Sequence, residues 1–285
     1  MKRVLITGAT GTVSQEVIRS LQPHTDQVTL IAGVRKLGDF RGNESNQEVQ
    51  FDLEDPGSFD TALQHIDTLF LLRPPQISQA KKYFEPIVSA AKRQRVKHVV
   101  FLSVQGADTN SVIPHHTIEE LIKPSGIDYT FLRPAYFIQN FLTTLKRDLV
   151  EKHRVFLPAG KAKFAVIDVQ DIGRVAAEVI LHSEQHQNQA YDLTNQELLS
   201  FGEMAQTLTK GLEIPIRYES PNLLKFFVTK KKQGLATPMV LVMIMLHYLP
   251  RFSNPPSLSG SVQQIAGQAP YTFEQFVRDH RQQLL

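Results

Sequence analysis

Residues 6–14, ITGATGTVS, join a short apolar run to an amphipathic segment and decide the fold of this 285-residue chain. Val4–Thr7 is typical of a buried strand, and Thr12–Leu21 places its apolar residues on one helical face. A glycine-rich loop in this context is typical of nucleotide-binding α/β proteins. Gly8 permits the tight turn, and Gly11 lets the backbone approach a pyrophosphate that rests on the positive end of the helix.

The other loop residues sharpen this prediction. Thr10 and Thr12 supply hydroxyl donors, and Val13 opens the helix beside them. Ser14 stands where such loops often carry a third glycine, so we expect slightly looser packing of helix on sheet with binding retained. The alternative is a plain strand–helix turn that needs glycine for its backbone alone.

The residues at the end of the next strand, Val28–Val34, indicate whether the cofactor is NAD or NADP. An NAD site usually has an acidic residue at this strand end, whereas this chain has Arg35 and Lys36 and no acid before Asp39. A guanidinium matches the geometry of a 2′-phosphate. We therefore favour NADP(H) over NAD(H), the alternative being two solvated cations.

A third strand at Val49–Phe51 ends in Asp52 and Leu53. We expect Asp52 to reach the adenine amino group and Leu53 to pack near the ring. Asp52 is also placed to cap the following turn, and the two roles are compatible.

Strands and helices continue to alternate along the chain. Further strands are expected at residues 67–72, 98–103 and 129–133, and helices at 78–94, 116–123 and 137–150. The alternation predicts an α/β fold, a Rossmann-type doubly wound parallel sheet. We expect residues 1–150 to form the NAD(P)-binding domain, with the chain returning to the sheet at about 164–195. Residues 196–285 are expected to form a mainly helical, small C-terminal α/β lobe that binds substrate.

The composition of the chain excludes several classes of protein and kinds of site. A net charge of +3 gives no basic footprint for nucleic acid, and the absence of cysteine excludes disulfides and thiolate metal sites. The longest apolar run, Met239–Leu246, is too short to span a bilayer, and the N-terminus lacks signal-peptide architecture. We expect a soluble cytoplasmic protein, monomeric or homodimeric, without a metal and without membrane contact.

Several stretches together resemble the NmrA-like group of atypical short-chain dehydrogenases/reductases. They are TGATGTVS, VRK, FDLEDP, VVFLSVQGAD, IEELIKPSGIDYTFLRPAYFIQNF, FAVIDVQDIGRVAAEVI and YDLTNQELLSFGEMAQTL. The resemblance implies an extended Rossmann domain with an NAD(P) cofactor lying across the strand ends. On that path we expect cofactor contacts from Leu72, Arg73, Ser103, Pro134 and Phe137, with Arg73 equally explained as a solvated loop residue.

The Tyr-x-x-x-Lys pair used by active members of the wider superfamily is missing. Counting back from Ser125-Gly126, the lysine position falls on His115 and the tyrosine position on Ser111. Histidine titrates near neutral pH, so His115 or His116 is a candidate acid, and Ser103 a candidate hydroxyl partner. A helix start after Pro114 explains both histidines without catalysis.

Two functions remain. One is an oxidoreductase that reduces a small quinone-type or apolar acceptor without the Tyr–Lys pair, the product oxygen being protonated by water or a substitute acid. The other is a non-catalytic redox sensor that binds NAD(P) and reports to a protein partner.

Overall fold

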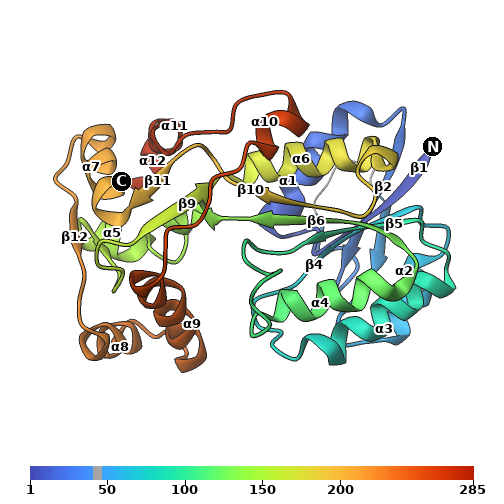
Figure 1. Cartoon of the computed structure of the whole chain (residues 1–285), viewed down its shortest axis with the longest axis horizontal. Helices are drawn as coiled ribbons and strands as arrows, with labels where there is room; N and C mark the ends of the chain where they lie inside the picture. The colour runs from blue at the N-terminus through green and yellow to red at the C-terminus, as the bar shows by residue number, and fades with distance from the viewer. Residues whose placement is uncertain (41–46) are drawn as a thin grey trace. The chain divides into compact units, whose positions relative to one another are not determined.

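The computed structural model describes residues 1–40 and 47–285 (Figure 1). The chain divides into two compact units. The first contains residues 1–135, 169–193 and 261–269, and the second contains residues 136–168, 194–260 and 270–285. The boundaries expected near residues 150 and 196 both fall inside the second unit.

The first unit is built on a seven-stranded sheet of order β10-β6-β5-β4-β1-β2-β3, in which every pairing is parallel. The order reverses at β1, with β2 on one side and β4 on the other, which is where ligands bind in open α/β sheets. The strands are β1 (Lys2–Thr7), β2 (Val28–Val34), β3 (Gln47–Gln50), β4 (Thr68–Leu72), β5 (His98–Leu102), β6 (Asp128–Pro134) and β10 (Gln189–Leu193).

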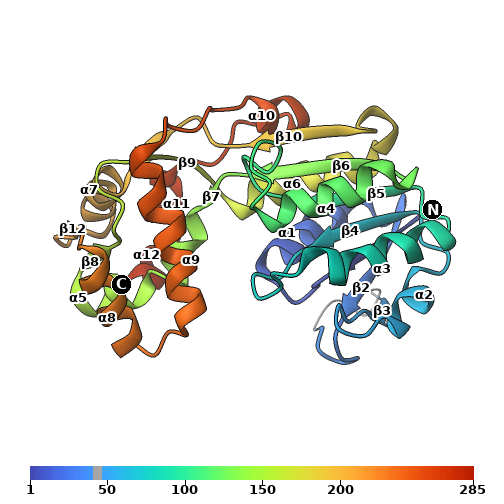
Figure 2. The same cartoon turned by 60° about the horizontal axis from the view of Figure 1, so that its bottom comes forward.

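Helices cover both faces of this sheet (Figures 1 and 2). Helices α1 (Thr12–Leu21) and α6 (Val169–Leu181) lie together on one face, with α10 (Ser261–Ala266) packed on α6. Helices α2 (Gly57–Leu63), α3 (Ala80–Arg93) and α4 (Pro114–Ile122) cover the other, over a core that includes Phe59, Phe84 and Phe101. The doubly wound Rossmann-type fold expected from the sequence is confirmed.

The contact between α1 and α6 depends on Gly173. A Cβ atom at this position would lie 2.7 Å from the backbone carbonyl of Glu16. That distance is shorter than any ordinary van der Waals contact, so any larger residue here would push the two helices apart.

The second unit holds two small sheets and most of the C-terminal helices. A three-stranded sheet has the order β11-β9-β7, and β12 pairs with β8. Its strands are β7 (Tyr136–Phe137), β8 (Arg154–Phe156), β9 (Lys163–Ile167), β11 (Leu198–Ser200) and β12 (Arg217–Glu219). Its helices are α5 (Lys146–Lys152), α7 (Phe201–Leu212), α8 (Leu223–Lys232), α9 (Thr237–Tyr248), α11 (Phe273–Asp279) and α12 (Arg281–Leu284).

The helix expected over residues 137–150 is wrong. Tyr136 and Phe137 instead pair with β9, a 3₁₀ helix covers Ile138–Leu142, and α5 begins only at Lys146. Ile138 and Phe141 are both buried in the core of the second unit. Their apolar spacing resembles that of an α-helix, but pairing with β9 extends the chain before the 3₁₀ turn.

Helix α9 is apolar all round. Val240, Met243 and His247 are buried, whereas Leu241 and Leu246 are about half exposed, at 54% and 50%. Among residues 1–40 and 47–285, no helix is long and apolar enough to cross a membrane.

Two buried histidines predict a loss of stability in acid. Burial lowers the pKa of His98 and of His247 to about 4 in the folded protein, against about 6.5 in an unfolded chain. Between these values the unfolded chain binds protons that the folded protein does not bind. The free energy of unfolding should therefore fall as pH drops from about 6.5 to about 4, by up to about 1.4 kcal/mol per pH unit for each histidine.

Urea unfolding at pH 7.5, 6 and 5 measures this loss. His98→Gln removes one titrating group and should reduce the slope. A free energy of unfolding that is constant across this range would contradict the assignment.

Candidate nucleotide-binding site

The loop between β1 and α1 is held in a fixed shape by its own backbone. Gly8 has φ 57°, in the left-handed region that glycine enters without strain. The amide of Gly11 donates to the carbonyl oxygen of Gly8 at 2.8 Å, and the amide of Ala9 donates to Gly33 of β2 at 3.2 Å. A side chain at Gly8 would also press on Leu72, whose Cδ1 would lie 3.2 Å from an added Cβ.

The N-terminus of α1 is open at this loop. Gly11 is the N-cap residue, and no side chain among the described residues caps the helix. The amides of the first turn, which lack partners inside any α-helix, therefore point out of the helix end. Gly8, Thr10, Gly11 and Thr12 are exposed, and Val13 is buried beneath them. Together they form an exposed cradle of backbone donors and hydroxyl groups, which suits an anion.

Ser14 does more than replace a glycine. It is fully buried, and its hydroxyl donates to the carbonyl oxygen of Thr7 at 2.8 Å. The hydroxyl of Thr7 in turn donates to Phe70 at 3.0 Å and accepts from the amide of Leu72 at 3.2 Å. These bonds join α1, β1 and β4 at the edge of the sheet where the loop begins.

Arg35 and Lys36 follow β2 directly and are exposed. Neither forms an ion pair with any residue in the described ranges 1–40 and 47–285. Their positive charges are available to a ligand at this end of β2.

Asp52 and Leu53 lie in the turn between β3 and α2. One carboxylate oxygen of Asp52 accepts from the amide of Glu54 at 3.0 Å, so the side chain stabilises the turn before α2. Leu53 is half-buried against the core beneath α3. The turn role expected for Asp52 is present, and its contact with adenine stays a prediction.

Leu72 and Arg73 come at the end of β4, next to the glycine loop. The guanidinium of Arg73 donates to the carbonyl oxygens of Pro74, at 3.1 Å, and Ile77. Its Nε donates to Nε2 of His115 at 3.3 Å. Arg73 therefore shapes its own loop and holds a histidine on α4.

His115 has a different protonation state from the one expected. Burial, with a smaller contribution from the charge of Arg73, lowers its pKa to about 3. Since arginine cannot accept a hydrogen bond, Nε2 is the acceptor and the ring proton lies on Nδ1. His115 is thus neutral at physiological pH and is not an imidazolium acid. Nδ1 of the neighbouring His116 lies 2.7 Å from the carbonyl oxygen of Ala107.

Ser103 lies at the end of β5 and bonds to a buried carboxylate. Its hydroxyl donates to Oε1 of Glu119 on α4 at 2.6 Å. Arg133 of β6 donates to the same carboxylate from Nε at 3.0 Å and from Nη2 at 2.6 Å, and lies 3.3 Å from Asp108. Because its hydrogen is committed to Glu119, Ser103 has no proton to give to a ligand oxygen.

Glu119 is a residue that the sequence reasoning missed. It follows His115 by four residues and precedes Ile122 by three, so all three share the inward face of α4. A carboxylate on such a face needs a cation beside it, and the sequence offers Arg133 in the following strand. This pattern could have revealed the pair. Arg133 thus ties β6 to α4 within the first unit.

The two remaining cofactor candidates lie in different units. Pro134 ends β6 in the first unit, and Phe137 belongs to β7 in the second. Phe141 and Phe226 are among the aromatic residues that are fully buried in the core of the second unit. Among the described residues, no three histidine, aspartate or glutamate side chains are grouped to hold a metal ion.

Comparison with known proteins finds one matching family and several similar reductases. The model of the NmrA-like family matches residues 1–248. An NAD(P)H azoreductase of Xenophilus azovorans is 30% identical over 288 residues, covering 97% of each chain. Quinone oxidoreductase 2 of Escherichia coli is 28% identical over 81% of this chain and 82% of its own. The triphenylmethane reductase of Citrobacter sp., solved with NADP(H), has a TM-score of 0.85 and 22% identity over 99% of this chain and all of its own.

The Glu119–Arg133 pair predicts a large loss of stability when its charge is removed. Glu119→Gln leaves Arg133 facing a neutral amide, with the more exposed Asp108 and the more distant Asp192 as carboxylates near it. Breaking a buried pair in this way costs about 3–5 kcal/mol. Urea unfolding at neutral pH measures the change.

Glu120→Gln on the same helix is the matched control. Glu120 pairs with Lys123 on the surface at 2.6 Å, so its loss should change the free energy of unfolding by less than about 1 kcal/mol. Equal effects of the two substitutions would show that the buried pair does not stabilise the first unit.

Proposed function

The chain belongs to the NmrA-like family, and from this premise we propose that it binds NADP(H) and reduces a small quinone-type or apolar acceptor. The observation that carries the proposal is the open N-terminus of α1, lined by exposed Gly8, Thr10, Gly11 and Thr12. Two relatives, an azoreductase and a quinone oxidoreductase, support the choice of reaction class.

The pyrophosphate of the cofactor is assigned to the glycine loop. Unpaired amides and the positive end of the helix dipole favour an anion there. The residues fit the group, since Gly11 has no side chain to obstruct a phosphate and no acidic residue lies in the first turn of α1. Leu72 and Arg73 flank the loop at the end of β4, along the path expected for the rest of the cofactor.

Selectivity for NADP(H) is assigned to Arg35 and Lys36. A phosphate on the ribose adds about two negative charges near neutral pH, which two exposed cations attract. NAD(H) carries no such group. The acidic residue that an NAD site would place at the end of β2 is absent, since Val34 is followed directly by Arg35.

The acceptor class follows from the proton donors at the sheet edge. When bound, the reduced nicotinamide supplies a hydride, so the acceptor must take up a proton from another source. The hydroxyl of Ser103 already donates its hydrogen bond to Glu119, and His115 is neutral at physiological pH. An acceptor whose reduced oxygen is a weak base, such as a quinone, can take that proton from water. A simple ketone would need a stronger acid.

The second candidate is a redox sensor that binds the nucleotide without turnover. It is favoured by Ser111 and His115 at the positions of the Tyr–Lys pair. In this case the nucleotide would change the affinity of the protein for a partner.

One experiment separates the two functions. The protein is mixed with NADPH, or in parallel with NADH, and a panel of benzoquinones and naphthoquinones, and the absorbance of the reduced nicotinamide is followed. We expect quinone-dependent oxidation, faster with NADPH. Simple aliphatic ketones in the same assay are the control and should not be reduced.

The other outcomes are equally informative. Tight NADPH binding, measured by calorimetry, without oxidation across the panel would support the sensor. Binding of neither nucleotide would overturn both functions.

A further inference from the structure

The turn after β2 has a defined backbone geometry, closed by a hydrogen bond. The amide of Asp39 donates to the carbonyl oxygen of Lys36 at 3.2 Å and closes a four-residue turn. Gly38, the third residue of that turn, has φ 90°, a conformation that L-residues with a side chain rarely adopt. Arg35 and Lys36 therefore lead into a turn of defined geometry.

Glu48 holds this turn from the neighbouring strand. It lies on β3, in register with Ala32 of β2. Its Oε2 accepts from the amide of Gly38 at 2.6 Å, and its Oε1 accepts from the amide of Phe40 at 3.1 Å. Both carboxylate oxygens are thus used on backbone amides of the turn, in charge-assisted hydrogen bonds that are stronger than neutral ones.

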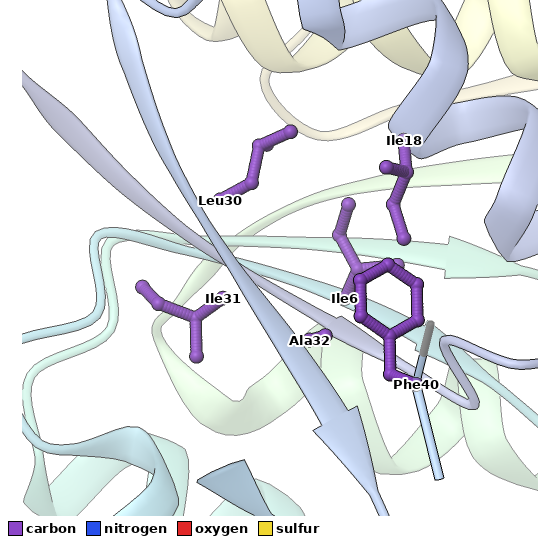
Figure 3. A pocket seen from close by; sticks show the side chains of 6 residues that line it. All are labelled: Ile6, Ile18, Leu30, Ile31, Ala32 and Phe40. Atoms are coloured by element: carbon purple, nitrogen blue, oxygen red, sulfur yellow. The ribbon is translucent and has the colours of Figure 1, made fainter. Parts of the chain in front are cut away.

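Phe40 provides a second anchor. Its side chain is only 9% exposed and lines a small apolar pocket with Ile6, Ile18, Leu30 and Ala32. Figure 3 shows the ring of Phe40 beside Ile6 and Ile18, so it packs between β1, β2 and α1. The turn is consequently fixed at Gly38 and Phe40 by a carboxylate and at Phe40 also by an apolar contact.

We propose that Glu48 is a positioning residue that sets selectivity for NADP(H) over NAD(H). It does so by holding the turn through which Arg35 and Lys36 are presented to the 2′-phosphate. This inference rests on the proposed function. Long, flexible cations bind a phosphate tightly only when little freedom is lost on binding, so a fixed backbone beneath them favours NADP(H). NAD(H) has no phosphate at this place and gains nothing from the fixed turn.

The sign of one substitution separates positioning from simple electrostatics. Glu48 carries a negative charge, which by itself repels a phosphate. If charge alone mattered, Glu48→Gln would bind NADPH more tightly. If Glu48 positions the turn, the same substitution weakens NADPH binding, because the amide group of Gln offers one acceptor for two backbone donors.

The test measures dissociation constants of NADPH and NADH by calorimetry. For Glu48→Gln we expect about tenfold weaker binding of NADPH, the effect of losing one hydrogen bond to a charged group, and less than about twofold change for NADH. Arg35→Ala is the reference and should remove the preference itself. Glu85→Gln removes the same charge from an exposed site on α3 and should leave both constants unchanged.

Two further measurements keep the result unambiguous. Amide hydrogen exchange at residues 36–40, without nucleotide, should be faster in Glu48→Gln than in the wild type. Phe40→Leu loosens the other anchor and should also weaken NADPH binding selectively, which covers the case in which Glu48→Gln folds poorly.

Unchanged or tighter NADPH binding by Glu48→Gln would overturn the positioning role while leaving the proposed function intact. A wild-type protein that binds neither nucleotide would overturn the proposed function, and this inference with it. A wild type that binds NADPH and NADH equally well would overturn the selectivity for NADP(H), and with it this inference, while leaving nucleotide binding intact.

Discussion

The hydrogen bonds at the end of β1 are the constraint on which the candidate site depends. Thr7 bonds through its carbonyl oxygen to Ser14 of α1, and through its hydroxyl to Phe70 and Leu72 of β4. These bonds fix the helix axis relative to the sheet edge at the point where the strand order reverses. The left-handed backbone at Gly8 then brings the uncapped end of α1 to the surface. An anion site results from main-chain geometry, with no charged side chain in the loop itself.

The role of Ser14 illustrates how a departure from a motif can be compensated. A serine in place of the third glycine adds a hydroxyl group where helix and strand come close. Its donation to Thr7 gives the buried Ser14 hydroxyl a partner inside the protein. The close approach of α1 to its other neighbour, α6, is secured separately by Gly173.

Local patterns in the sequence were sufficient for most of the first unit. The apolar runs gave the strands β1 and β2 and the helix α1 with correct bounds or nearly so, because their apolar pattern reflects burial in a sheet that helices cover on both faces. The loop candidates Gly8, Thr10, Gly11, Thr12 and Val13 could also be named from the sequence, since they lie close together in the chain; their contact with a nucleotide stays a prediction. The helix expected over 137–150 failed because pairing of Tyr136 with Val166 is a long-range contact.

The supporting residues of the site could not be found in the same way. Glu119 meets Ser103 and Arg133 only after α4 packs against β5 and β6. Glu48 and Phe40 act on the turn after β2 from positions that look like an ordinary polar strand residue and an isolated aromatic. Their roles arise from pairing between β2 and β3, which no local pattern encodes. The protonation state of His115 likewise depends on burial and on Arg73, 42 residues away in the chain.

The central claim is that the glycine loop and the open end of α1 hold the phosphates of the nucleotide. Amide proton–nitrogen correlation spectra, recorded while NADPH is added, test it most directly. The account predicts saturable shifts of the Thr12 and Val13 amides, moving downfield as they donate to phosphate oxygens. NADPH binding that leaves these two amides unchanged would contradict it.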